Sequence, residues 1–206
     1  MAIRLIIFDV GGVIIDYSEE MYMHYLSKKL KMGWLNLWHV LEPLVEQMEL
    51  DKIDEKTMEK RFAKGIGIKS DGKLEWVSAF KKLAKPNWGV VNIVNELADS
   101  GKYNVVILSD ISKSRWREAN ALILNKLRVK KRFASCYIKM RKQDRDPKKR
   151  PYRYVLKNMH ARARGAIFID NMPSNVAGAQ EVGINGIVFK NVVQLKRDLA
   201  KFGVYV

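Results

Sequence analysis

A chain of 206 residues with 48% hydrophobic side chains and a formal net charge of +16 can bury a sizeable core, which excludes global disorder. Its single cysteine, Cys136, excludes an intramolecular disulfide framework and favours a reducing compartment. The three histidines lie far apart in the sequence and leave no zinc cluster, so any metal must be bound by oxygen ligands.

The apolar run at the start of the chain is too short for an export signal. Residues 3–8 are apolar apart from Arg4, but Asp9 follows at once, whereas a signal peptide needs a longer apolar stretch and a cleavage site of small residues. No segment approaches the roughly 20 apolar residues of a membrane span. We therefore expect a cytoplasmic protein with no membrane partner.

Two different patterns follow each other along the first half of the chain. Residues 3–8 form a short apolar run that predicts a buried strand, and Gly11 and Gly12 indicate a loop behind it. Between residues 18 and 85, apolar side chains recur at helical spacing, with many Met and Trp residues and no strand pattern. We expect an all-helical insert of about four helices at 17–88, and a core formed by 1–16 and 89–206.

From residue 90 onward, strand and helix patterns alternate. We expect helices at 90–101, 113–126, 150–159, 174–182 and 192–201. We expect strands at 104–108, 133–138, 166–169 and 186–189. This order predicts an α/β fold with a Rossmann-like parallel sheet flanked by helices, in which ligands bind beyond the carboxyl ends of the strands.

Polar residues follow three of the predicted strands and should converge at that edge. They are Asp9, then Ser109 with Asp110, then Asp170 with Asn171. Each aspartate alone could be a helix cap or a turn residue. Together with Lys142, after a fourth strand, they describe a phosphoryl-transfer site: a carboxylate can attack phosphorus, a second can hold Mg²⁺, and a hydroxyl and a lysine can bind the phosphoryl oxygens.

Four segments in order resemble the motifs of the haloacid dehalogenase-like hydrolase superfamily, over residues 3 to about 190. They are Phe-Asp-Val-Gly-Gly-Val-Ile-Ile-Asp at 8–16, Val-Ile-Leu-Ser-Asp at 106–110, the stretch 135–156 around Lys142, and Ile-Phe-Ile-Asp-Asn-Met-Pro-Ser-Asn at 167–175. The Gly-Gly pair resembles the first motif of one cap-bearing branch of this superfamily. That branch resembles sugar-phosphate phosphatases. The helical insert falls where this family carries a small helical cap, which we expect to cover the site from hinges near 16–18 and 86–89.

The resemblance implies a role for each matching position. Asp9 would be the nucleophile, Ser109 would bind the phosphoryl group, and Lys142 would neutralise its charge. The Mg²⁺ site would involve Asp9, the Gly11 carbonyl, Asp170 and Asn171. Substrate contacts would come from Gly11, Gly12, Asp110 and Asn175.

Three departures from the family pattern bear on activity. Gly11 stands where the phosphatases usually have an aspartate acting as general acid, a contribution typically worth about 10²–10⁴-fold. Asn171 replaces the second aspartate of the fourth motif and removes one negative charge from the metal site. The loop after Lys142 is longer and more basic than usual in the family. If Lys142 is not the charge-neutralising lysine, Lys139 or Lys148 takes that role.

The resemblance leaves three functions open. The leading one is a Mg²⁺-dependent phosphatase that hydrolyses a small phosphorylated metabolite through an aspartyl-phosphate. A metal-free 2-haloacid dehalogenase ranks lower, because that branch normally lacks an acid at the position of Asp170. The third is a weakly active protein that binds nucleic acid or another polyanion through residues 126–164. This segment contains 16 Lys and Arg residues but only two acids. Of the two roles for this basic segment, we prefer attraction of an anionic substrate and place a polyanionic partner second.

Overall fold

The computed structural model describes residues 2–69 and 74–206 and contains a parallel sheet of five strands in the order β5-β4-β1-β6-β7. The central strand, β1, pairs with β4 on one side and with β6 on the other, so that Leu5 lies opposite Asn104 and Ala166. The strands are β1 (Leu5–Phe8), β4 (Asn104–Ser109), β5 (Lys131–Ala134), β6 (Ala166–Asp170) and β7 (Asn185–Val188). The predicted α/β fold class is confirmed.

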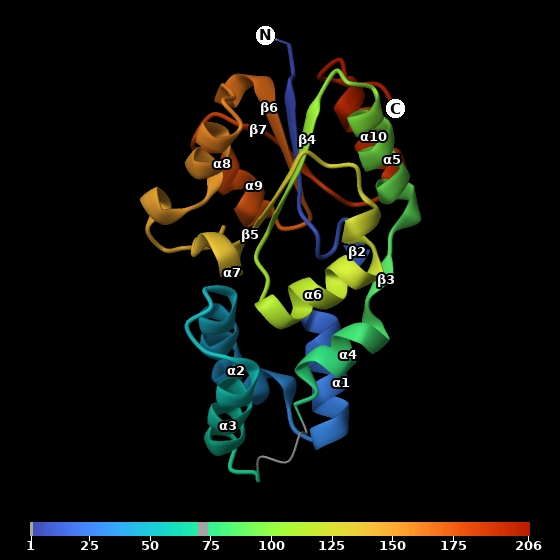
Figure 1. Ribbon diagram of the computed structural model, residues 1–206. Coiled ribbons are helices and arrows are strands. Elements are labelled where there is room, and N and C mark those ends of the chain that lie inside the picture. The colour runs from blue at the N-terminus through green and yellow to red at the C-terminus, as the bar shows by residue number, and fades with distance from the viewer. Residues whose placement is uncertain (1, 70–73) are drawn as a thin grey trace.

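Helices cover both faces of this sheet because successive strand residues face opposite sides. Ile6 and Phe8 pack into one apolar cluster with α5 and α10, whereas Leu5 and Ile7 pack into a second one with α8 and α9 (Figure 1). The α6 helix lies between the sheet and the helical lobe that residues 19–69 and 74–83 form (Figure 1). The helices are α5 (Trp88–Asp99), α6 (Lys113–Leu122), α8 (Tyr152–Asn158), α9 (Pro173–Gln180) and α10 (Val192–Ala200).

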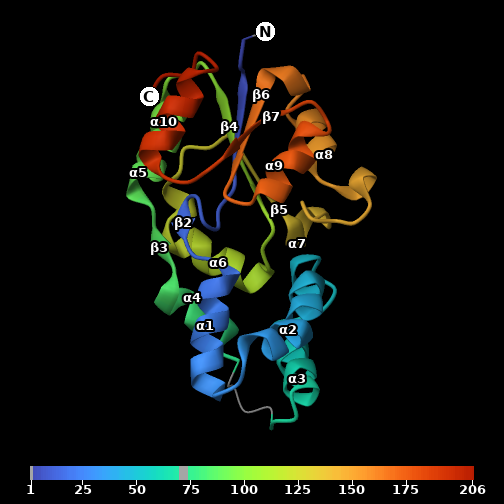
Figure 2. The ribbon, with the colours of Figure 1, turned by 180° about the vertical axis from the view of Figure 1, so that it is seen from behind.

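The predicted insert forms a separate helical lobe, the cap, beyond the carboxyl ends of the strands (Figures 1 and 2). Its described residues contain four helices: α1 (Glu19–Leu30), α2 (Trp34–Glu49), α3 (Glu55–Gly65) and α4 (Trp76–Leu83). The side chains of Ser18 and Asp54 accept hydrogen bonds from the first turns of α1 and α3, which is why these helices begin there. Residues 70–73 of the predicted insert lie outside the described part.

The cap is joined to the core by a short antiparallel pair of strands, which differs from the expected all-helical insert. In this pair, Ile15 of β2 (Ile15–Asp16) lies opposite Pro86 of β3 (Lys85–Pro86). The expected helical stretch reached Lys85. A residue before proline avoids helical backbone, so α4 ends at Leu83 and the chain becomes extended.

Two further elements differ from the prediction, both near the sheet edge. The strand expected at 133–138 is β5 at 131–134, and Ser135–Ile138 form the short helix α7. The Ser135 hydroxyl lies 2.9 Å from the Ile111 amide nitrogen, which ties this turn to the end of β4. The helix expected to reach 126 stops at Leu122. Short 3₁₀ turns of the described residues lie at Leu124–Lys126, Pro147–Lys149 and Ala163–Gly165.

No helix of the described residues is both long and apolar enough to cross a bilayer.

Candidate active site

The carboxyl ends of the three central strands bring together the polar residues that the sequence singled out. Asp9 directly follows β1, while Ser109 and Asp170 end β4 and β6. All three are buried, with 6%, 2% and 0% of their surfaces exposed. Buried polar groups need partners, and two of these find the same one.

That shared partner is Lys142, which reaches the site from the loop after α7. Its Nζ lies 2.7 Å from Asp9 Oδ1 and 2.7 Å from Asp170 Oδ2. Its backbone N–H donates to the carboxylate of Asp110, at 2.9 and 3.1 Å from the two oxygens. Asp110 therefore holds the segment that carries the lysine. Of the alternative lysines, Lys139 pairs instead with Asp51 in the cap.

The charges of this group are strongly coupled. Burial raises the pKa of Asp9, repulsion from Asp170 raises it further, and Lys142 opposes both effects. Burial lowers the pKa of Lys142, but the attraction of Asp9 and Asp170 outweighs it and the net pKa lies above its ordinary value. One ammonium group thus serves two carboxylates, and a further cation at this place would be stabilised.

The oxygen atoms around Asp170 fit a magnesium ion as ligands. Asp170 Oδ1 accepts a hydrogen bond from the Met172 N–H at 2.8 Å, and Oδ2 accepts one from Asn175 Nδ2 at 3.0 Å. Asn175 Oδ1 is buried without a hydrogen-bond partner and remains available as an acceptor. Among the described residues, no three His, Cys, Asp or Glu side chains form a metal cluster. Mg²⁺ is usually held by only one or two carboxylates with water and substrate oxygens, so Asp9 and Asp170 suffice.

The two glycines after Asp9 are not equivalent. Gly12 has φ +73°, and a Cβ there would lie 2.5 Å from the Asn171 side chain, so only glycine lets these two loops approach. A Cβ at Gly11 would make ordinary contact, 3.5 Å from the Tyr17 carbonyl oxygen. Packing therefore requires Gly12, whereas it leaves room for a side chain at position 11.

A cleft of about 540 Å³ connects the strand ends with the cap. This volume lies in the range of small-molecule sites. The core side contains the predicted residues Asp9, Gly11, Ser109, Asp110, Lys142, Asn171 and Asn175. The cap side is formed by aromatic, apolar and acidic side chains, among them Trp38, Val45, Trp76 and Phe80.

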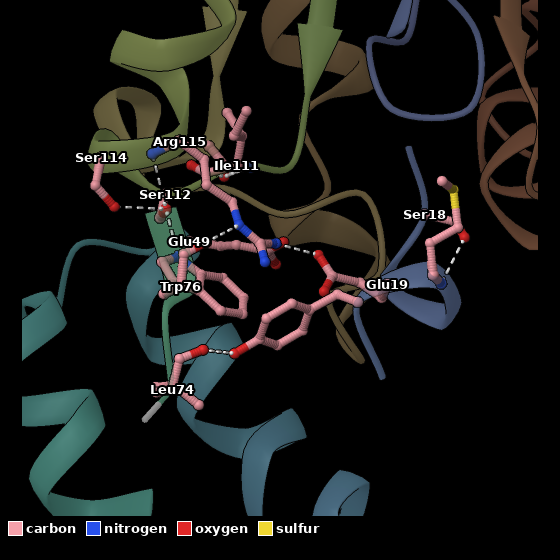
Figure 3. Close-up of polar contacts among 12 residues, drawn as sticks. Ser18, Glu19, Glu49, Leu74, Trp76, Ile111, Ser112, Ser114 and Arg115 are labelled. Carbon is pink, nitrogen blue, oxygen red and sulfur yellow. Dashed lines mark hydrogen bonds and ion pairs between the residues drawn. The ribbon is translucent and has the colours of Figure 1, made fainter. Parts of the chain in front are cut away.

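Sequence reasoning missed Arg115, a core residue of α6 that extends under the cap (Figure 3). Its guanidinium carbon lies 3.2 Å from the centre of the Trp76 ring, and its Nη1 donates to Glu19 Oε1 at 2.6 Å. Its Nη2, Glu19 Oε2 and the Tyr17 hydroxyl are buried without hydrogen-bond partners. No local pattern could reveal this cluster, because Glu19 and Arg115 are 96 positions apart.

A second set of contacts joins the cap to the core at the end of α2. Asp51 lies 2.8 Å from Lys113 Nζ and 2.6 Å from Lys139 Nζ. Glu49 Oε2 accepts a hydrogen bond from Nε of Arg141 at 2.6 Å. Burial raises the pKa of Glu49 to about 7, with Asp110 adding to the effect and Arg141 opposing it.

The basic segment 126–164 is therefore not a uniformly free cationic face. Lys139 and Arg141 pair with the cap, Lys142 lies in the site, and Arg150 pairs with Glu181. Within the described residues, this segment contributes only Arg141, Lys142 and Gln143 to the cleft wall.

Comparison with known proteins agrees with this architecture. A curated relative, flavin mononucleotide hydrolase 1 of Arabidopsis thaliana, is 35% identical over 74 residues, which are 36% of this chain and only 29% of that protein. A HAD-family enzyme from Bacteroides thetaiotaomicron has a similar fold, with a TM-score of 0.76 and 20% identity over 92% of this chain and 95% of that one. That enzyme has also been solved in complex with magnesium and inorganic phosphate.

Two further structures extend the range of the fold. A HAD-like hydrolase from Porphyromonas gingivalis matches with a TM-score of 0.76 and 21% identity, covering 98% of this chain and 99% of that one. The L-2-haloacid dehalogenase of Xanthobacter autotrophicus matches with a TM-score of 0.61 and 13% identity, covering 97% and 83%. The family description "haloacid dehalogenase-like hydrolase" matches residues 3–183. Since this match spans most of the sequence, the chain belongs to the haloacid dehalogenase-like hydrolase family.

Proposed function

We propose that this hydrolase is a Mg²⁺-dependent phosphatase of the cap-bearing branch with a Gly-Gly first motif, acting on a small phosphorylated metabolite. The observation that carries the proposal is the bridge of Lys142 between Asp9 and Asp170 at the strand ends. A haloacid dehalogenase has no cation to hold, and a fully buried Asp170 would then have no role in its chemistry. The magnesium–phosphate complex of the Bacteroides enzyme supports the same choice.

In the proposed reaction, Asp9 attacks phosphorus and the bond to the leaving oxygen breaks. The aspartyl-phosphate that results is hydrolysed by water, which releases phosphate and restores Asp9. Lys142 and Ser109 balance the charge of the phosphoryl oxygens, while Asp110 keeps Lys142 in place. Bound Mg²⁺, held by Asp9 and Asp170 with Gly11 and Asn171 beside them, would supply further neutralisation of that charge. Gly11 has no side chain to protonate the leaving oxygen, so good leaving groups should react fastest.

The test is hydrolysis of p-nitrophenyl phosphate with and without Mg²⁺, beside chloride release from 2-chloropropionate. We expect Mg²⁺-dependent phosphate release, and a loss of at least about 10³-fold in kcat for Asp9→Asn, because an amide cannot act as the nucleophile. Asp99→Asn on α5, an exposed change of the same chemistry, is the control and should leave kcat unchanged. Wild-type turnover in Asp9→Asn, or chloride release without phosphate release, would refute the proposal.

A binding function for the basic segment is the remaining alternative. Several of its charges are engaged in ion pairs, which disfavours it. The wild type should accordingly retain little nucleic acid in a filter-binding titration at physiological salt, where screening acts over about 8 Å.

A further inference from the structure

The cleft has the opposite charge to the protein as a whole. The chain has a formal charge of +16. The described residues that line the cleft include six acids and three bases, a formal net charge of −3 with every acid ionised. The acids are Asp9, Glu19, Glu20, Glu42, Glu49 and Asp110, and the bases are Arg115, Arg141 and Lys142.

The excess of acids lies on the cap, away from the phosphoryl-transfer group. All four glutamates come from the cap, and no described cap lysine or arginine lines the cleft. Glu19 and Glu49 are matched by the core residues Arg115 and Arg141. Among the described residues, Glu42 has no basic partner on the cleft wall, and Glu20 has one contact, of 3.6 Å with the exposed His24. The cap end of the cleft is therefore net negative.

The same end also offers apolar surface and unused hydrogen-bonding groups. Trp38, Phe80 and Val45 provide aromatic and aliphatic contacts. Glu19 Oε2, the Tyr17 hydroxyl and Arg115 Nη2 are buried, lack partners, and belong to side chains that line the cleft. Buried polar atoms of this kind carry a desolvation cost, which a ligand would relieve with N–H groups for Glu19 and Tyr17 and an uncharged acceptor such as a carbonyl oxygen for Arg115.

We infer that the cap end of the cleft receives the leaving group of the substrate, that this group is an uncharged or cationic ring bearing N–H donors, and that a second anionic group is excluded. The inference rests on the proposed phosphatase function and adds the substrate class. A carboxylate or second phosphate on the leaving group would have to approach Glu20 and Glu42, two solvent-exposed carboxylates of the cleft wall, and would be repelled by them. An ammonium group would be attracted by the same side chains.

The experiment compares three phenyl phosphates of similar size that differ only at the para position: aminomethyl, hydroxymethyl and carboxylate. We expect kcat/KM to fall in this order, with at least about a tenfold preference for the cationic over the anionic ester. In Glu20→Gln/Glu42→Gln the preference should shrink by at least about threefold. Glu96→Gln, an exposed change on α5 outside the cleft, is the matched control. Comparing the preference between variants removes the intrinsic reactivity of each ester.

The outcomes separate this inference from the phosphatase proposal. If the esters are hydrolysed but the carboxylate is preferred, or if the double variant keeps the wild-type preference, the leaving-group inference is wrong and the phosphatase stands. If no ester is hydrolysed, the phosphatase proposal fails. Calorimetric titration of the three esters into the wild type with Mg²⁺ then decides the inference, since equal or tighter binding of the carboxylate would overturn it.

Discussion

Two of the contacts between the cap and the core, among the described residues, are built in different ways. On the α4 side, the guanidinium of Arg115 stacks on Trp76, and Trp76 Nε1 donates to Ser112 Oγ at 3.3 Å (Figure 3). At the end of α2, the contacts are ion pairs between cap acids and core bases, such as Asp51 with Lys139. The Arg115 side chain is 4% exposed, whereas those of Asp51 and Lys139 are 29% and 51% exposed.

This difference assigns separate mechanical roles to the two contacts. A buried cation enclosed by aromatic rings cannot be released without leaving charge and rings unpaired. The partly exposed ion pairs of Asp51 exchange for water at little cost and are screened by salt, whereas the side chains of Glu49 and Arg141 beside them are only 11% and 15% exposed. We therefore expect the α2 end of the cap to open before the Arg115 contact breaks when the cap admits substrate, as lids do.

The largest effect should come from breaking the buried contact. Arg115→Ala removes the partner of Glu19 and the ring contacts of Trp76, and should lower the free energy of unfolding by about 2–4 kcal/mol. Arg128→Ala, at an exposed pair with Asp99, is the matched control and should cost about 0–1 kcal/mol. Urea denaturation measures both. Equal losses in the two variants would show that burial does not distinguish the contacts.

A smaller effect should follow from titrating Glu49 at the α2 end. Its pKa rises on folding from an ordinary 4.5 to about 7, so the folded state binds the proton more tightly. The stability that this group contributes is complete below pH 4.5 and is lost as the pH rises toward 7. Glu49→Gln cannot titrate, and its free energy of unfolding relative to the wild type should therefore increase by about 1–3 kcal/mol over that interval, the upper end being the full value of a shift from 4.5 to about 7. Denaturation at several pH values tests this, and a difference that stays flat or falls would contradict it.

The smallest effect should come from Asp51, whose side chain is 29% exposed, against 11% for that of Glu49. Asp51 has φ 56°, a left-handed conformation that asparagine also tolerates, so Asp51→Asn removes the charge with little backbone strain. We expect a loss of about 0.5 kcal/mol at low salt that disappears near 1 M salt. A loss that is independent of salt would mean that Asp51 acts through its shape instead of its charge.

The sequence predicted the catalytic half of the site better than the cap half. Asp9 directly follows a buried strand, and Ser109 and Asp170 end two others. Parallel strands place their carboxyl ends at one edge of the sheet, so the meeting of these residues could be anticipated. Arg115 and Glu49 could not be found in this way. Each meets a partner more than 90 positions away across the cap–core boundary, and no periodicity encodes such a contact.

The errors in secondary structure have local causes. The apolar residues of 133–138 suit a strand, but Ser135 bonds to Ile111 and bends the chain into α7. Lys142 therefore follows a helical turn instead of a strand. The end of the cap was mispredicted at Lys85, where the constraint from Pro86 outweighed the helical pattern.

The pairing of Ile15 with Pro86 has a consequence in polymer terms. The two chain segments that connect the cap to the core are paired with each other as β2 and β3. With respect to the core, the cap is therefore a loop whose two ends are held together. The entropy of closing such a loop grows only with the logarithm of its length, about 0.6 kcal/mol for each doubling. The insert can thus lengthen, shorten or be exchanged with little cost to the sheet, and new leaving-group pockets can be placed over the same aspartates and lysine.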